Sequence, residues 1–176
     1  MVKVYKFFAY FTLFILALIY FMPKLNLYYA FEKELQNYKV VFVEGAKQDK
    51  GFSLALDNVE VFYDSINIAK AQHVKLNTFL IYNSLDIKNI RLMGLASSFV
   101  PTYIQQIDAH YTILNPLNVV ANAYGEFGSA SISLNLIDKN ITINLKPSKL
   151  MLQKYKMTLN NFKKTEDGEY RYAKTF

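Results

Sequence analysis

An uninterrupted apolar run near the N-terminus constrains this chain more than any other feature. Sixteen residues, from Phe7 to Met22, include no charged residue, glycine or proline. As an α-helix they would span roughly 24 Å, slightly less than the ~30 Å hydrocarbon core of a bilayer. Lys6 precedes the run and can extend its ammonium group back to the lipid headgroups. A core helix of a soluble domain normally has a polar stripe, which this run lacks, so the run predicts a transmembrane helix.

The residues that flank this run predict its orientation and its processing. Lys3 and Lys6 precede it, and basic residues before a first hydrophobic helix favour a cytoplasmic N-terminus. The stretch after Met22 has no A-x-A-like pair of small residues, so we expect an uncleaved anchor rather than a cleaved signal. A type IV pilin helix is a further alternative, but such helices have a glutamate near their start. The predicted division is a cytoplasmic stub (1–6), a transmembrane helix (7–23) and one β-rich domain beyond the membrane (24–176).

The composition limits the chemistry of this domain. The chain has no cysteine, which excludes a disulfide framework and a thiolate metal site. Its net charge is +6, and the excess of basic residues lies between Lys139 and Phe176. Such a segment can bind anionic lipid or an acidic partner. The alternative is that its lysines form a solvated surface that binds neither.

The periodicity changes from helical to β after the apolar run. Leu25 to Leu35 has helical spacing, which predicts a short amphipathic helix at the membrane surface. From Lys39 onward the period is two, and short strands alternate with turns. At Asp57-Asn58 the apolar residues change from even to odd positions, which indicates a bulge or a tight turn. Residues 66–69 are expected to form a short strand of their own, separate from the next one. We predict a mainly β (α+β) fold with a mostly antiparallel, twisted sheet and one or two short helices after the transmembrane helix.

The clearest hairpin runs from Ser129 to Lys146. Apolar and small polar residues alternate along both of its strands, as in a sheet with one solvent-exposed face. The apolar residues that we expect to form a core face or to line a groove are Leu134, Leu136, Ile141 and Ile143. Pro147-Ser148 ends the hairpin, and Ser148 is a suitable N-cap for a following helix.

Residue patterns for catalysis or metal binding are missing. His73 and His110 are far apart in sequence, and each lies in a predicted strand. The carboxylates of Asp57, Glu60 and Asp64 lie close together but lack metal-loop spacing, so a polar strand face and turn explain them better. No nucleophile elbow, phosphate loop or zinc-protease motif occurs. We therefore expect a non-enzymatic protein without cofactor, metal or nucleic-acid partner.

One local motif is an acceptor for N-glycosylation. Asn140-Ile141-Thr142 matches N-x-T, and Asp138 matches the acidic extension that bacterial systems favour. We expect Asn140 to lie exposed in a hairpin turn. The alternative is a chance occurrence in an asparagine-rich chain.

The layout as a whole resembles the protein N family of the type II secretion pathway. The resemblance lies in the anchor, in Gly51 to Leu92 with its phrases LDNVEVF and LDIKNIRLMG, and in the closing segment GEFGSASISLNLIDKNITINLKPS. The chain is also similar in style to the inner-membrane-anchored β-groove families that handle lipid, including the lipopolysaccharide-export anchor protein. This resemblance implies a bacterial inner membrane, a periplasmic domain and no catalytic residues.

Two functions are compatible with these patterns. The first is a subunit of an envelope-spanning secretion or assembly system that binds protein partners through sheet edges and faces. The second is a lipid-binding or lipid-transfer module with an apolar β groove. A sheet face without a covering helix would favour lipid. We expect a closed core, because most apolar sheet faces in domains of this size are covered by protein.

Overall fold

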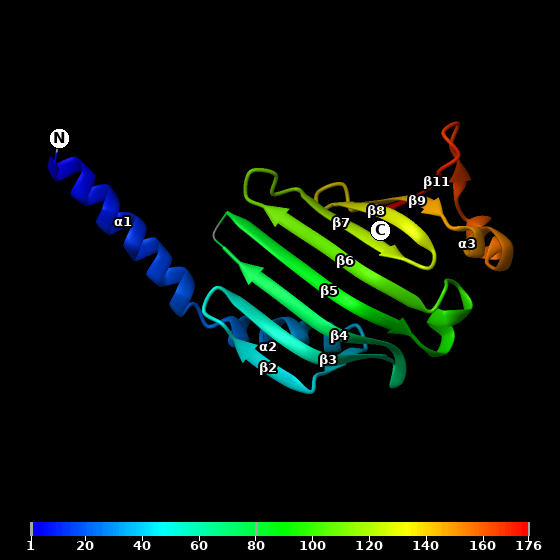
Figure 1. Ribbon diagram of the computed structural model, residues 1–176, viewed down its shortest axis with the longest axis horizontal. Coiled ribbons are helices and arrows are strands. Elements are labelled where there is room, and N and C mark those ends of the chain that lie inside the picture. The colour runs from blue at the N-terminus through cyan, green and yellow to red at the C-terminus, as the bar shows by residue number, and fades with distance from the viewer. Residues whose placement is uncertain (1, 80, 176) are drawn as a thin grey trace.

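The computed structural model describes residues 2–79 and 81–175, and it begins with two helices in series. Helix α1 (Val2–Phe21) contains the apolar run, and its segment Val4–Phe21 is long and apolar enough to cross a membrane. Helix α2 (Lys24–Gln36) follows after Pro23, which confirms the predicted short helix. Figure 1 shows α1 projecting away from the rest of the molecule, with α2 against the sheet.

One antiparallel sheet forms the remainder, which confirms the predicted fold class. Its strands are β1 (Val40–Val43), β2 (Ala46–Asp49), β3 (Ser53–Tyr63), β4 (Ile66–Thr78), β5 (Tyr82–Leu92), β6 (Tyr103–Thr112), β7 (Asn118–Gly125), β8 (Gly128–Asn135), β9 (Asn140–Pro147), β10 (Lys163–Lys164) and β11 (Tyr170–Thr175). The spatial order is β1-β3-β4-β5-β6-β7-β8-β9-β11-β10, and β2 also pairs with β3. The short helices are η1 (Gly94–Ser98), α3 (Lys149–Lys154) and α4 (Lys156–Leu159).

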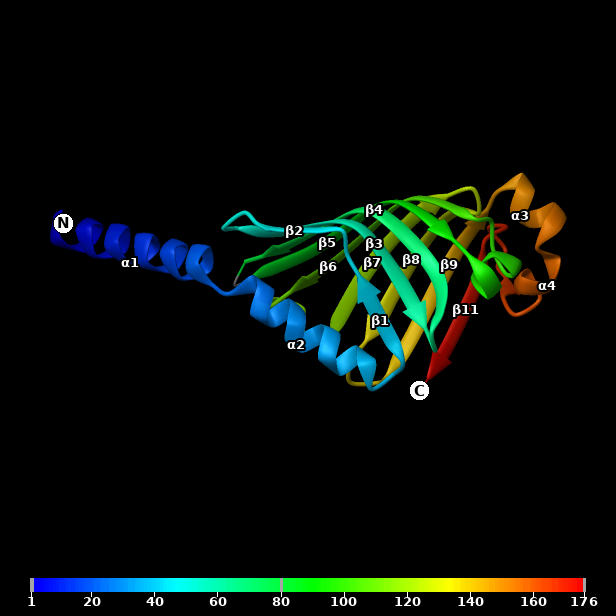
Figure 2. The ribbon, with the colours of Figure 1, turned by 90° about the horizontal axis from the view of Figure 1, so that it is seen from below.

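The strand register gives the sheet one apolar and one polar face. Two rows of directly paired residues cross it from β3 to β11, and their members are apolar. The first row is Leu56, Val74, Ile87, Ile107, Ala123, Ala130, Leu145 and Tyr170, and the second is Leu54, Leu76, Leu85, Ala109, Ala121, Ile132, Ile143 and Tyr172. A row of the opposite face runs through Lys75, Asp86, Asp108, Asn122, Ser131, Asn144 and Arg171. Figure 2 shows the sheet curled into an arch, with β1 and β11 descending at its two margins.

A line of bends crosses four neighbouring strands at the same level. Asn58 in β3 and Asn89 in β5 have left-handed backbone angles, with φ of 52° and 53°, which asparagine tolerates better than most residues. Asn89 donates a side-chain hydrogen bond to Gln72 in β4 (2.9 Å) and accepts one from the Tyr103 hydroxyl (2.8 Å). Beside them, the β6–β7 register is irregular between Ile104 and Gln106. On each of the four strands, the apolar residues just before and just after this line are three positions apart, where a regular strand would have an even spacing. These residues are Leu56 and Val59, Val74 and Ala71, Ile87 and Ile90, and Ile107 and Ile104.

One of these bends is among the predicted alternatives. The parity shift at Asp57-Asn58 is a bulge-like bend within β3 and not a tight turn. The prediction of a separate short strand at 66–69 is wrong, because these residues belong to the same thirteen-residue strand as Val74 and Leu76. The apolar residues change parity within this strand as they would across a turn.

Two buried clusters hold helices against the apolar face, one at each margin of the sheet. Near β3, Tyr28 of α2 packs with Leu54, Leu56 and Val59. Near β9, Met151 and Leu159 of α3 and α4 pack with Ala123, Phe127 and Leu145. Within the described residues the two clusters do not join.

The predicted cap of the last helical region is confirmed. The Ser148 hydroxyl accepts a hydrogen bond from the Met151 backbone N–H (3.1 Å), which satisfies a free donor in the first turn of α3. The same hydroxyl donates to the Glu126 carbonyl and thereby ties this turn to the β7–β8 turn.

We expect Ser148→Ala to lower the free energy of unfolding by about 1 kcal/mol, because it removes this cap. For a domain of this size that corresponds to a fall in Tm of about 2–4 °C, measurable by circular dichroism. Ser148→Thr keeps a hydroxyl that can make both hydrogen bonds and should lose less stability. Equal losses for the two variants would contradict a capping role.

Candidate functional site

The middle of the apolar face forms the candidate site. Its central side chains on β5 to β8 are half-buried, whereas those at the margins are buried by α2 or by α3 and α4. We call this central, half-buried part the trough. Its members are Leu85, Ile87, Ile107, Ala109, Tyr111, Val119, Ala121, Ile132 and Leu134. The buried clusters at the two margins stay separate, whereas a fully covered face would join them into one.

The predicted hairpin lies in and beside this trough. Leu134 lies directly opposite Ile141, and Ile132 lies opposite Ile143, so the structure brings three of the four expected residues onto one face. These side chains are half-buried, while Ser131 and Ser133 on the other face of β8 are exposed. On β9, Ile141, Thr142, Ile143 and Asn144 are all half-buried, so the expected difference in exposure is not found for these four residues; it is found further along, where Leu145 is buried and Lys146 is exposed.

The fourth expected residue, Leu136, lies outside the hairpin strands. Strand β8 ends at Asn135, and Leu136 is in the following turn with 47% of its surface exposed. The turn is held by the Asn135 side chain, which accepts hydrogen bonds from the backbone of Ile137 and Asp138. Alternation alone cannot show where a strand gives way to such a turn.

A row of paired residues, some polar and some apolar, forms the end of the trough nearest α1. It pairs Thr78 with Asn83, Asn83 with Tyr111, and Tyr111 with Val119. The row continues through Leu134 and Ile141 to Lys174. The trough is therefore apolar along its length and gains polar groups at this end.

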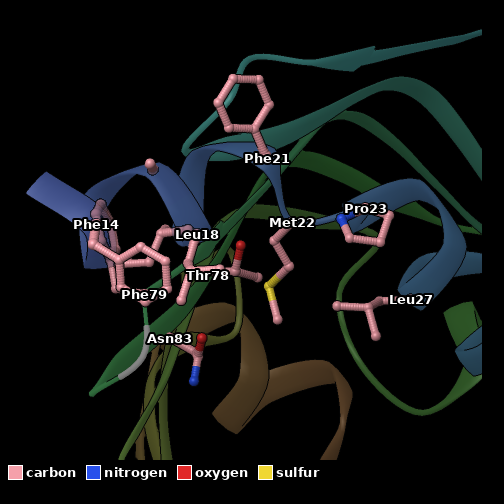
Figure 3. A pocket seen from close by; sticks show the side chains of 11 residues that line it. Phe14, Leu18, Phe21, Met22, Pro23, Leu27, Thr78, Phe79 and Asn83 are labelled. Atoms are coloured by element: carbon pink, nitrogen blue, oxygen red, sulfur yellow. The ribbon is translucent and has the colours of Figure 1, made fainter.

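A pocket of about 710 Å³ joins this end to α1. Figure 3 shows its lining, in which Phe14, Leu18 and Met22 of the helix region face Thr78, Phe79 and Asn83 of the β4–β5 hairpin. Ala17, Ile19, Phe21, Pro23 and Leu27 complete it. Sequence analysis did not anticipate this pocket, because only the fold brings the hairpin beside the helix.

A buried lysine fixes the end of α1. Lys24 is fully buried, and its Nζ donates hydrogen bonds to the carbonyls of Ile19 (3.1 Å), Tyr20 (3.4 Å) and Met22 (3.2 Å). Asp49 at the end of β2 lies 3.9 Å away. Because the last carbonyls of a helix have no intrahelical partner, Lys24 both caps α1 and joins it to the sheet.

The β2–β3 turn packs on the same end of α1. Gly51 has φ +75°, and a Cβ at this position would lie 2.2 Å from the Tyr20 ring. Tyr20 also makes an edge contact with Phe52, with ring centroids 5.4 Å apart. Glycine is therefore required here both for the backbone angle and for the close approach of the helix.

Helix α2 closes one margin of the trough through Tyr28. Burial, reinforced by the nearby carboxylates of Glu44 and Glu32, raises the pKa of the Tyr28 phenol above its usual range. Lys47 of β2 lies over the neighbouring Tyr29 ring, 4.5 Å from its centroid, which adds a cation–π contact at this margin.

The histidines and acids lie apart from the trough. His73 pairs with Asp57 on the polar face (2.7 Å), and Glu60 binds Lys70 (2.9 Å). His110 stacks on Tyr82, and Asp64 pairs with Lys39. Among residues 2–79 and 81–175, no three His, Cys, Asp or Glu side chains gather into a possible metal site.

Asn140 does not occupy the exposed turn that we predicted. It is the first residue of β9, it is half-buried, and it pairs with Asn135 and Thr175. Its Oδ1 is buried and has no hydrogen-bond partner in the described part of the chain. The turn ends one residue earlier than the sequence indicated, so Asn140 is less accessible to a modifying enzyme.

Comparisons of the chain with protein-family models, with curated proteins and with solved structures find no significant match. The resemblance to the protein N family therefore stays a prediction.

Proposed function

We propose that this protein is a membrane-anchored, lipid-binding module whose trough holds acyl chains. One observation carries the proposal: the apolar rows continue across the sheet, yet their central side chains are only half-buried. Soluble surfaces rarely leave a continuous apolar patch of this kind uncovered unless it binds something. Such surfaces are typical of sites for apolar ligands, in which a few polar groups fix the orientation of the ligand.

The shape of the trough suits an elongated ligand. Small residues, Ala109 and Ala121, form its floor between the larger Leu85 and Ile132. The polar side chains of Thr78 and Asn83 lie at the α1 end and can bind a headgroup or an ester. The opposite end is bounded by the cluster around Met151 and Leu159. An acyl chain that lies along the strands would therefore have its polar end toward the membrane.

The same proposal includes a location. Lys3 and Lys6 before the apolar run favour a cytoplasmic N-terminus, which puts the sheet on the far side of the membrane. We propose a bacterial inner membrane and a periplasmic domain. Transport of lipid within the envelope is the process that this combination supports.

Photocrosslinking tests the lipid ligand. In proteoliposomes that contain a phospholipid with a diazirine in its acyl chain, the full chain should form adducts at Ala109 and Ala121, which form the floor of the trough. Leu134→Asp adds a charge to the trough and should reduce these adducts several-fold without loss of folding, because a half-buried charge can stay hydrated. Adducts are mapped by mass spectrometry, and folding is checked by Tm.

Ser133→Asp is the matched control, because Ser133 is the exposed neighbour on the polar face of the same strand. It should leave the adducts and the Tm unchanged. A Leu134→Asp variant that fails to fold would indicate a closed core instead. A folded variant with unchanged adducts would show that the trough does not hold lipid.

A role in protein assembly is supported by a different observation. Strand β10 pairs only with Arg171 and Tyr170, so within the described chain the outer edge of β11 from Tyr172 to Thr175 has no neighbouring strand. Such an edge can accept a strand from a partner. A photocrosslinker at Ala173 in intact membranes should then give a protein adduct of defined mass, whereas one at exposed Met157 should not.

A further inference from the structure

The loops at the α1 end of the sheet carry an unusual density of exposed apolar residues. We call them the rim, and its tip residues are Phe52, Phe79, Ile81, Tyr82, Ile113, Leu114, Leu117, Leu136 and Ile137. Leu114 is 90% exposed, and Ile81 and Ile137 are 64% and 66% exposed. The loop between Thr112 and Asn118 contains no charged residue. A soluble surface would normally place polar side chains at such tips.

Backbone hydrogen bonds join these loops in spatial order. The Thr78 N–H donates to the Phe52 carbonyl (3.4 Å), and the Ile113 N–H donates to the Ile81 carbonyl (3.1 Å). The Leu136 N–H donates to the Leu117 carbonyl (2.8 Å). The apolar tips therefore form one connected rim rather than separate mobile loops.

The packing on α1 fixes the depth of this rim. Phe79 lines the same pocket as Phe14 and Leu18, and its ring stacks on Phe52, with centroids 5.9 Å apart. Phe14 lies seven residues before the end of the helix at Phe21, which corresponds to about 10 Å along the helix axis. If α1 spans a bilayer, Phe79 is therefore at the level of the lipid, not above it.

We propose that the rim inserts into the bilayer, so that the α1 end of the trough opens directly onto the membrane. Ile81, Leu114 and Ile137 lie in the interfacial and acyl region, where exposed aliphatic side chains are stabilised, and the charged Asp138 and Lys139 beside Ile137 lie among the headgroups. Figure 1 shows these loops on the side of the sheet from which α1 projects. The bilayer is the one occupant that is continuous with the membrane span of α1. The inference rests on the rim and on α1, and it holds whatever the trough binds.

Site-specific fluorescence measures this depth in the full chain. Because the protein has no cysteine, a single Leu114→Cys or Ile137→Cys substitution gives one attachment site for an environment-sensitive nitrobenzoxadiazole label. In liposomes of phosphatidylcholine and phosphatidylglycerol, lipid-attached nitroxide should quench both labels several-fold more than aqueous iodide does. The emission of both labels should shift to shorter wavelength.

Leu95→Cys is the matched control. Leu95 is also an exposed leucine, 67% accessible, but it lies in η1 at the opposite end of the sheet. Its label should be quenched by iodide and not by the lipid nitroxide. Labels at Leu114 and Ile137 that respond as Leu95 does would overturn the proposal, whether or not lipid is found in the trough. Since all three substitutions are at exposed positions, folding does not limit the test.

Discussion

Gly128→Ala should strongly destabilise the sheet domain. Gly128 has φ +114°, and an added Cβ would lie 2.0 Å from the Lys146 carbonyl oxygen and 2.8 Å from the Ser148 nitrogen. An unfavourable backbone angle costs about 1–3 kcal/mol and overpacking a further 1–3 kcal/mol. The combined loss of about 2–6 kcal/mol is a large part of the roughly 5–15 kcal/mol that stabilises an ordinary domain. Equilibrium unfolding of the purified chain in denaturant measures it.

Gly168→Ala separates the two causes. Gly168 also has a positive φ, +78°, but nothing lies within 4 Å of an added Cβ. Its variant should therefore lose only the backbone contribution, about 1 kcal/mol. Similar losses for Gly128→Ala and Gly168→Ala would show that the contact with the β9 backbone is unimportant.

The second large effect is expected at the joint between α1 and the sheet. Lys24→Met removes two hydrogen bonds to the last carbonyls of α1 and one to the Met22 carbonyl just after it, and leaves Asp49 without its buried partner. Hydrogen bonds to charged groups contribute roughly 1.5–3 kcal/mol, so we expect at least this loss in free energy of unfolding. Hydrogen exchange at the amides from Met22 to Leu27 should become faster, because the joint opens before the sheet unfolds.

Lys33→Met is the control for this prediction. Lys33 lies in the same α2 helix but is exposed, so its replacement should change stability by no more than about 0.5 kcal/mol. Exchange at the joint should stay slow in this variant. If Lys24→Met behaves as Lys33→Met does, the buried amine does not hold α1 to the sheet.

The parts of the fold that sequence predicts are those determined by local patterns. The α1 span follows from an uninterrupted apolar run, and the cap of α3 follows from Ser148 after a proline. The pairing of Leu134 with Ile141 follows from alternation on both sides of one turn. In each case the residues that set the structure are neighbours in sequence.

The features that sequence missed depend on residues that are distant in the chain. The parity shift at Asp57-Asn58 indicates a bulge or a tight turn, and only the fold shows that β3 continues through it and that β5 bends at Asn89 on the same level. Whether an apolar face is covered depends on where α2, α3 and α4 pack, and alternation contains no information about that. The pocket beside Phe79 likewise exists only because the β4–β5 hairpin returns to α1.

The strand order has a consequence for how the chain is made. From β3 to β9 each strand pairs with the next one in sequence, so no pairing in this part of the sheet waits for a distant segment. A chain that leaves a translocation channel from its N-terminus would have α1 in place first, and each new hairpin would find its partner already formed. Short sequence separation between paired strands favours rapid folding and shortens the time during which apolar surface is exposed. The protein can therefore fold in the order of its synthesis, one hairpin after another.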